Sequence, residues 1–222
     1  MRRHRPLIGW PMWDSKRRRF SMPNEIWDQK LRPIEFTIFS YLCHHQSHDP
    51  PDQITLQIIA NSVHSTEITV KKYIESLIDK ELITDGWLLA PSLQCNSCKN
   101  FFTLPNEIFL LKLPPSVFIV YAYLLLIEDR KTHTCHPSYN TIAAGTGLSK
   151  NTALKSIGTL LESGLITVKS SSYYDKLGMK WKGNNLYTIL PIYSAVDTFY
   201  RRQLKKLELD MARSRFAAQT AM

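Results

Sequence analysis

The chain has 222 residues, 44% of them hydrophobic, and its formal net charge is +9. No stretch approaches the roughly 20 uninterrupted apolar residues that a membrane-spanning helix needs, and the arginine-rich N-terminus lacks the apolar run of a secretory signal. We therefore exclude an integral membrane protein and expect a cytoplasmic one, with enough chain for two small domains.

The first 19 residues are strongly basic, with seven basic side chains against one aspartate. Such a segment attracts the phosphates of nucleic acid. We expect an arm that lies along phosphates or in a minor groove, with Arg17, Arg18 and Arg19 among its DNA contacts. A tail that only increases solubility is the alternative.

An internal repeat sets the expected architecture. The sequence FSMPNEIW at residues 20–27 returns as FTLPNEIF at residues 102–109, an offset of 82, and after one inserted residue the matches continue at an offset of 83. Matches in this order indicate a duplicated unit. The predicted division is into an arm, two domains and a C-terminal segment: residues 1–19, 20–101, 102–193 and 194–222.

Each copy has the pattern of a winged helix-turn-helix unit, with three helices at an apolar spacing near 3.6 residues and then a β-hairpin. In the first copy we expect the second and third helices at residues 55–62 and 66–80, and a strand-loop-strand at 82–102. The predicted fold is mainly helical α+β, with small β-wings: a tandem winged helix-turn-helix repeat plus a C-terminal helix.

Cys95 and Cys98 lie in the expected wing of the first copy, where a Cys-x-x-Cys turn provides two zinc ligands. A structural zinc site needs four. The other candidate ligands are Cys43, His44, His45, Cys135 and His136. Because thiols stay reduced in the cytosol, two free thiols in a loop are the alternative, and we expect no cofactor.

The second copy has clearer element boundaries. Its expected elements are helices at residues 115–128, 138–145 and 150–163 and wing strands at 165–168 and 186–190. The turn before the third helix contains Gly145 and Gly147, which tolerate positive φ, and Ser149 is placed to cap that helix. Gly164 is placed to end it in a left-handed conformation.

The third helix of the second copy is the predicted DNA reader, because the major groove of B-DNA admits one α-helix. Ala153, Ile157 and Leu160 have core spacing. The outward positions are Lys150, Asn151, Thr152 and Lys155. Asparagine can form two hydrogen bonds with adenine, and lysine can reach guanine or a phosphate.

The matching helix of the first copy has a different charge. Its outward positions are Thr66, Glu67, Thr69, Lys71 and Lys72, so that Glu67 replaces Lys150. Residues 20–100 contain six basic and ten acidic side chains, whereas residues 101–193 contain nine and five. We expect the second copy to bind DNA and the first to bind it weakly or to contact protein. The alternative is that both copies are only packing modules.

The wing loop of the second copy is basic and aromatic. Lys176, Lys180 and Lys182 are candidates for salt-dependent contacts with the DNA backbone or minor groove. A solvated hairpin tip is the alternative.

Residues 194–216 predict a last helix with an apolar stripe. The stripe consists of Val196, Tyr200, Leu204, Leu207 and Met211. It either packs on the protein's own core or forms the seam of a homodimer, and a dimer implies two DNA half-sites.

Five motifs of the second copy resemble the helix-turn-helix domain proteins of integrative and conjugative elements of Firmicutes. They are LPNEIF (104–109), CHPSY (135–139), LSKNT (148–152), GLIT (164–167) and LYTI (186–189). These winged helices are also similar to plasmid replication initiators and to the primosome protein DnaD. The chain departs from the pattern at Leu154, where a basic residue is usual, and at Gly158 inside the reading helix.

The resemblance implies a DNA-binding protein and suggests a transcriptional regulator of a mobile genetic element. A replication initiator and a protein-interaction module that touches no DNA are the other hypotheses. The chain has neither a Gly-x-x-x-x-Gly-Lys-Ser/Thr loop nor a His-Glu-x-x-His motif, so we expect no enzymatic activity.

Overall fold

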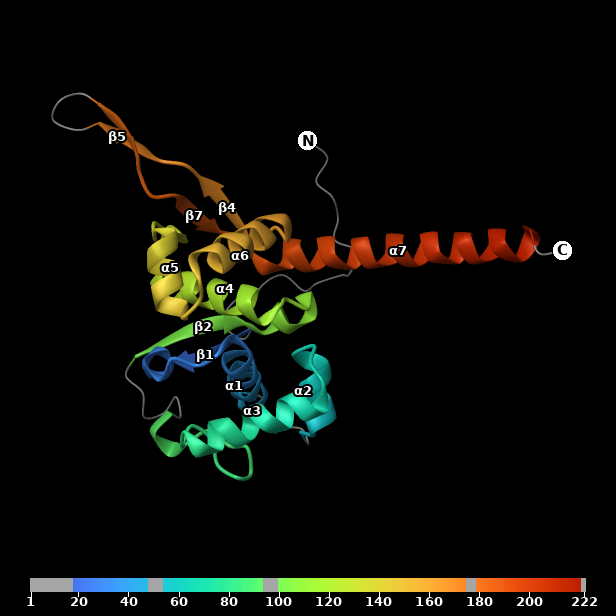
Figure 1. Ribbon diagram of the computed structural model, residues 1–222, viewed down its shortest axis with the longest axis horizontal. Helices are drawn as coiled ribbons and strands as arrows, with labels where there is room; N and C mark the ends of the chain where they lie inside the picture. Colours follow the sequence, from blue (N-terminus) through green and yellow to red (C-terminus); the bar gives the residue numbers. More distant parts are fainter. Residues whose placement is uncertain (1–17, 48–53, 94–99, 175–178, 221–222) are drawn as a thin grey trace.

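The computed structural model describes residues 18–47, 54–93, 100–174 and 179–220. The first copy contains β1 (Arg19–Pro23), the 3-10 helix η1 (Asn24–Gln29), α1 (Pro33–Gln46), α2 (Leu56–Ser62), α3 (Glu67–Asp79) and η2 (Pro91–Leu93). The second contains β2 (Phe101–Pro105), η3 (Asn106–Leu111), α4 (Pro115–Ile127), β3 (Thr134–Cys135), α5 (Tyr139–Thr146), α6 (Lys150–Glu162), β4 (Ile166–Lys169), β5 (Ser172–Tyr174), β6 (Lys180–Lys182) and β7 (Leu186–Ile189). The last helix is α7 (Ile192–Thr220). The predicted α+β winged-helix fold is confirmed (Figure 1).

The two copies are joined by one antiparallel strand pair, β1 with β2. Ser21 pairs with Thr103, and the same two residues are equivalents in the sequence repeat. On either side, Phe20 pairs with Leu104 and Met22 with Phe102. The pairing therefore relates the copies by a local twofold axis, and α1 and α4 pack against each other beside it (Figure 1).

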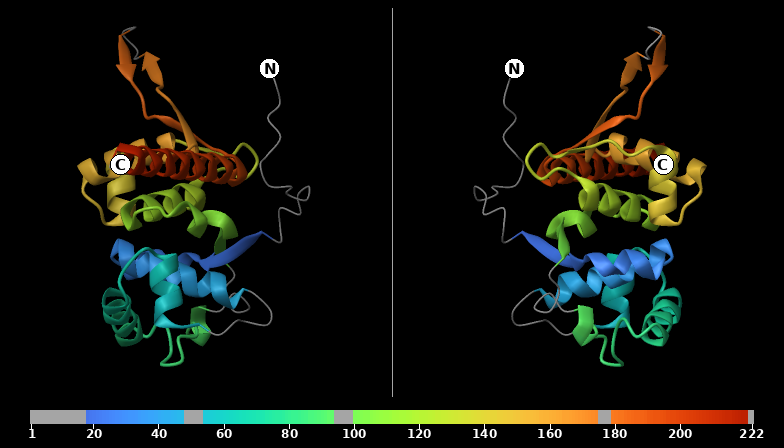
Figure 2. Two further views of the ribbon diagram at one scale, coloured as in Figure 1. Left: turned by 90° about the vertical axis from the view of Figure 1, so that its right-hand side faces the viewer. Right: turned by 90° about the vertical axis from the view of Figure 1, so that its left-hand side faces the viewer.

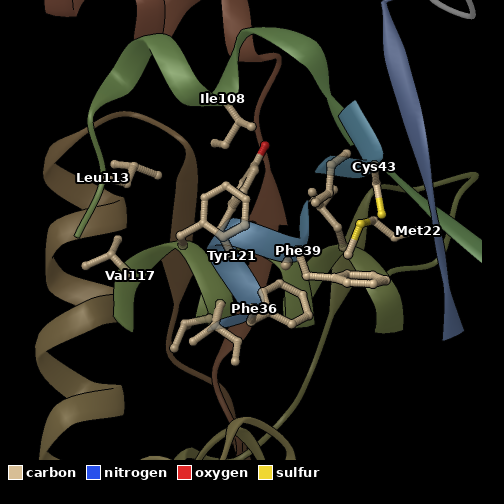
Figure 3. Close-up of a cluster of buried hydrophobic side chains, with 14 of the residues drawn as sticks. Met22, Phe36, Phe39, Cys43, Ile108, Leu113, Val117 and Tyr121 are labelled. Atoms are coloured by element: carbon tan, nitrogen blue, oxygen red, sulfur yellow. The ribbon is translucent and has the colours of Figure 1, made fainter. Parts of the chain in front are cut away.

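The buried side chains of both copies form one continuous core. Aromatic rings join the halves: the ring centroids of Phe36 and Phe118 are 6.2 Å apart, and those of Trp27 and Phe102 are 5.9 Å apart. Figure 3 shows Phe36 of α1 and Tyr121 of α4 among the buried side chains of this core. Instead of the two small cores expected from the sequence, the structure has a single core, and the predicted boundary between residues 101 and 102 lies inside β2.

The wing of the second copy is longer than the sequence indicated. β7 lies between β3 and β4 in a three-stranded antiparallel sheet, where Thr167 pairs with Thr188. The stretch expected to be a polar loop contains a second strand pair, β5 with β6. The hairpin therefore projects far from the helices (Figure 1).

The wing of the first copy differs from its prediction. Among the described residues of this wing, one isolated bridge joins Ile83 and Leu89. Phe102, expected to return to this wing, pairs instead with Met22 of β1. The prediction of a strand-loop-strand over residues 82–102 was wrong at its second strand, because the side chains of Phe102 and Leu104 are buried in the core that β1 and β2 share.

A buried carboxylate ties α1 to the end of α3. Glu35 Oε1 accepts hydrogen bonds from Lys80 Nζ at 2.9 Å and from the Ser76 hydroxyl at 2.7 Å, and Oε2 accepts one from the Arg32 backbone N–H at 2.8 Å. Burial alone would raise the pKa of Glu35, but these hydrogen bonds outweigh it and lower the pKa below its ordinary value.

Replacing Glu35 with glutamine should lower the free energy of unfolding at pH 7 by about 1 kcal/mol, a figure reduced because the partner Lys80 is partly exposed to water. Since the folded pKa of Glu35 is lowered, its carboxylate stabilises the fold above the ordinary pKa, and that stabilisation is lost as the pH falls through the folded value. Urea unfolding of both proteins from pH 7 to pH 3 should show the difference shrinking, and a constant difference would contradict this assignment.

The last helix is longer than the expected 194–216 and only its beginning packs on the body. Ala195 and Val196 are buried, and this end of α7 contacts η3. Beyond Arg201 the described side chains are exposed, and the helix runs out past the other elements (Figures 1 and 2). The interpretation in which the whole stripe packs on the protein's own core therefore holds only for its first part. Among the described residues, no helix is long and apolar enough to cross a membrane.

Candidate nucleic-acid interface

The helix-turn-helix of the second copy is formed by α5, a short turn and α6. The Ser149 side chain caps α6 by accepting a hydrogen bond from the Thr152 backbone N–H at 3.1 Å. Gly147 in the turn has a φ of 67°, and Gly164 after α6 has a φ of 71°. The predicted cap and the predicted left-handed glycine at the end of α6 are confirmed, and the positive φ of the turn belongs to Gly147 rather than to Gly145.

One side of α6 is buried and the other faces outward. The buried residues are Ala153, Ser156, Ile157 and Leu160. Lys150, Asn151 and Lys155 are exposed, as predicted. Thr152 is half-buried, and its hydroxyl lies 2.8 Å from the Ser149 hydroxyl. Thr152 therefore belongs to the cap of α6, and Lys150, Asn151 and Lys155 are the predicted DNA contacts of this helix that are exposed.

A hollow lies beside the start of α6. It has a volume of about 180 Å³ between the start of α5, the start of α6 and the end of the wing. Its lining residues are Pro137, Ser138, Tyr139, Asn140, Lys150, Gly183, Asn184, Asn185 and Tyr187. Only Lys150 among them is charged, and the rest of the polar lining consists of amide and hydroxyl groups, a combination suited to an anion.

The wing side of the hollow is held in place by hydrogen bonds. Asn185 Nδ2 donates to the Tyr139 hydroxyl at 3.1 Å and lies 3.4 Å from the Tyr187 hydroxyl. Burial raises the pKa of Tyr187 to about 12, so its hydroxyl keeps its proton at neutral pH. Tyr139 and Asn185 were not predicted from the sequence, because residues 46 positions apart give no local signal of their contact.

The structure describes only part of the wing segment that carries the other lysines predicted to contact DNA. Lys180 and Lys182 stand at the two ends of β6, paired with Tyr174 and Ser172, and the directions of their side chains lie outside what the structure describes. Lys176 lies in residues 175–178, also outside the described residues.

Arg18 and Arg19 contact the second copy of their own chain. Arg18 Nη1 lies 3.4 Å from Glu107 Oε1. Arg19 Nε donates to the Thr103 hydroxyl at 2.8 Å, and its Nη2 donates to the Thr103 carbonyl oxygen at 2.7 Å. These contacts fasten β1 to β2 at the end of the predicted arm, whereas Arg17 lies outside the described residues.

The corresponding surface of the first copy is not equivalent. Glu67 and Ile68 of α3 occupy the places of Lys150 and Asn151 at the repeat offset of 83. The Ile68 side chain is 83% exposed. Ile68 was not among the residues predicted from the sequence, although the offset alone would have found it. The first copy therefore presents an acidic and an apolar side chain where the second presents a basic and an amide side chain.

The cysteines give no metal centre within the described ranges, where no three His, Cys, Asp or Glu side chains are grouped to hold a metal ion. Cys43 and Cys135 are both buried. Burial raises the pKa of Cys135 to about 12, so this thiol stays protonated at neutral pH. Cys95 and Cys98 lie in residues 94–99, outside the described residues, and the zinc hypothesis for them stays a prediction.

Comparison with known proteins places a helix-turn-helix domain in the second copy. Residues 111–166, from the end of η3 to the start of β4, match the family model of a helix-turn-helix domain. The chain is also similar to the solved structure of a possible transcriptional regulator from Methanosarcina mazei Go1, with 16% identity and a TM-score of 0.34 over 53% of this chain and 92% of that one. No curated protein matches the chain.

Proposed function

We propose that the chain is a sequence-specific, double-stranded DNA-binding protein that regulates transcription, and that its helix-turn-helix domain at residues 111–166 inserts α6 into the major groove. The observation that carries the proposal is the outward face of α6, where Lys150, Asn151 and Lys155 are exposed on a helix whose opposite side is buried. A helix held in this way fits a groove about 12 Å wide and reads base edges from its first turns.

The hollow beside Lys150 supports a contact with the DNA backbone in the same complex. A phosphate there would meet the Lys150 ammonium group beside Asn184, while Asn185 holds Tyr139 and Tyr187 in place. Lys180 and Lys182 belong to β6 of the projecting wing, and we assign them to salt-dependent contacts with the adjacent DNA backbone. The second copy thus supplies both base reading and backbone binding.

The first copy packs against the second copy, which carries the proposed DNA-reading helix. Its α1 packs on α4, and the exposed start of its α3 has Glu67 where the reader has Lys150. A carboxylate at that place would be repelled by phosphates. We therefore assign DNA reading to one of the two copies.

The motif resemblance supports regulation of a mobile genetic element as the setting. The exposed stripe of α7 supports the homodimer, which would present two α6 helices to two half-sites. A replication initiator would instead require several repeats of the motif and a loss of replication when the protein is removed.

Selection from a random-sequence duplex library tests the proposal. The full chain should enrich one motif, and Asn151→Ala should lose discrimination at one A·T pair, by about 1–3 kcal/mol, while it still binds DNA. Ile68→Ala, at the equivalent exposed position of α3, is the matched control and should leave the motif unchanged. Retained DNA without any enriched sequence would contradict specific recognition, and the absence of retained DNA would favour the protein-interaction module.

A further inference from the structure

The outer part of α7 presents large apolar side chains to solvent. Leu204, Leu207 and Met211 are 51%, 57% and 49% exposed. This part of the helix extends beyond the body, as the long axis of the molecule in Figure 1 shows. A helical segment without tertiary contacts is only marginally stable in water, and an exposed apolar stripe on a helix is typical of a surface that packs on another helix.

The stripe is narrow and its two edges differ in charge. At 3.6 residues per turn, Leu204, Leu207 and Met211 lie within about 60° of one another around the helix axis. Arg201 and Glu208 lie along one edge of this stripe, and Gln203 and Asp210 lie along the other. Leu209 points about 170° away from the centre of the stripe.

We propose that a second copy of this chain packs its α7 antiparallel against this stripe, which deepens the homodimer of the proposed function and rests on it. When Leu204 faces the partner's Leu207, the spacing along the helix brings Arg201 beside the partner's Glu208. The twofold symmetry of a homodimer repeats both contacts. Arg201 also pairs with Asp197 of its own chain at 2.8 Å, and a guanidinium with five N–H donors can serve both carboxylates.

The edge of the stripe that carries Arg201 and Glu208 is complementary in charge to its own copy in the antiparallel orientation. In an antiparallel pair, each edge of the stripe lies beside the same edge of the partner helix, running in the opposite direction. Arg201 at one end of this edge therefore meets the partner's Glu208 at the other end. A parallel pair brings unlike edges together and places Glu208 beside the uncharged Gln203. The two contacts between Arg201 and Glu208 therefore form only in the antiparallel pair.

The contact has a small apolar area, with three large side chains from each helix. Interfaces below about 1,200 Å² are usually weak and transient. The dimer should therefore form in a concentration-dependent manner, with a dissociation constant on the order of micromolar to tens of micromolar, and DNA with two half-sites should favour it.

Sedimentation equilibrium of the full chain from about 1 to 200 μM tests the contact. The wild type should dimerise, and Leu204→Ala combined with Leu207→Ala should weaken the dimer at least ~10-fold. Leu209→Ala is the matched control, since Leu209 is 52% exposed on the opposite face of the same helix, and it should leave the dimer unchanged. A monomeric wild type, or equal weakening by Leu209→Ala, would overturn the proposal.

Charge exchange tests the orientation. Arg201→Glu and Glu208→Arg should each weaken the dimer, and the protein with both changes should recover it, because the two charges then exchange places across the antiparallel contact. Failure of the combined variant to recover would overturn the antiparallel pairing. Each variant is also assayed for binding to DNA with one half-site, which should not change, so that loss of the dimer is distinguished from loss of the proposed DNA binding.

Discussion

Replacing Lys150 and Lys155 together with alanine should reduce the affinity for duplex DNA by roughly 30-fold or more at about 0.1 M salt, because each lysine is expected to contribute a phosphate or guanine contact of about 1–3 kcal/mol. Both side chains are exposed on the outward face of α6, and Lys150 lines the hollow at its start. Fluorescence anisotropy with labelled duplex DNA measures the change. The slope of log affinity against log salt should also become less steep by about 0.9 for each phosphate that the variant no longer binds.

The first copy provides the matched control for this experiment. Lys71 and Lys72 of α3 are also exposed, and Lys72 is the equivalent of Lys155 at the repeat offset of 83. Replacing both with alanine removes the same number of charges, and DNA affinity should fall less than about 3-fold, as expected for long-range electrostatics alone. Equal reductions in the two variants would mean that net charge, and not the face of α6, determines binding.

Replacing Phe36 with alanine should cost about 3–5 kcal/mol of the free energy of unfolding and should destabilise both copies together. The Phe36 side chain is fully buried, with its ring centroid 4.8 Å from that of Trp27 and 6.2 Å from that of Phe118 in the other copy. Because the copies share one core, calorimetry should show one cooperative transition in the wild type and one transition at a lower temperature in the variant.

Phe101→Ala is the control for the Phe36 experiment, since Phe101 lies in β2 at the junction of the copies but its side chain is exposed. It should change the stability by less than about 1 kcal/mol. Two separate transitions in the wild type, with only the earlier one moved by Phe36→Ala, would contradict the shared core.

The sequence predicted those elements whose signals are local. The predicted third helix of the second copy, residues 150–163, and the observed α6 differ by one residue, because its serine cap and the glycine after it act within a single turn of the chain. Ala153, Ile157 and Leu160 are buried as their spacing predicted. The helical spacing of apolar residues likewise predicted three helices in each copy of the repeat.

The sequence could not show contacts between distant segments. FSMPNEIW and FTLPNEIF were identified as equivalent, but their pairing as β1 and β2 follows from the shared core and not from either segment alone. Because Phe102 pairs with Met22 of β1, it does not form the second strand that we expected in the wing of the first copy. The hollow was missed for the same reason, because Tyr139 and Asn185 meet only in the folded chain.

The two copies agree in their buried positions and differ in their exposed ones. The buried positions agree between them: Val70 and Ile74 in α3 match Ala153 and Ile157 in α6. Their outward positions differ in charge and polarity. Burial thus constrains the core positions of the helix in both copies, whereas the exposed positions at its start are free to differ.

The most direct test of α6 as the DNA reader is photo-crosslinking from two equivalent exposed positions. A photoreactive amino acid is placed at position 154 of α6 in one protein and at position 71 of α3 in another, which are equivalents at the offset of 83 and are both exposed. The account predicts crosslinks to duplex DNA from position 154 and none from position 71. Crosslinks from position 71 alone, or from neither position while DNA is bound, would contradict it.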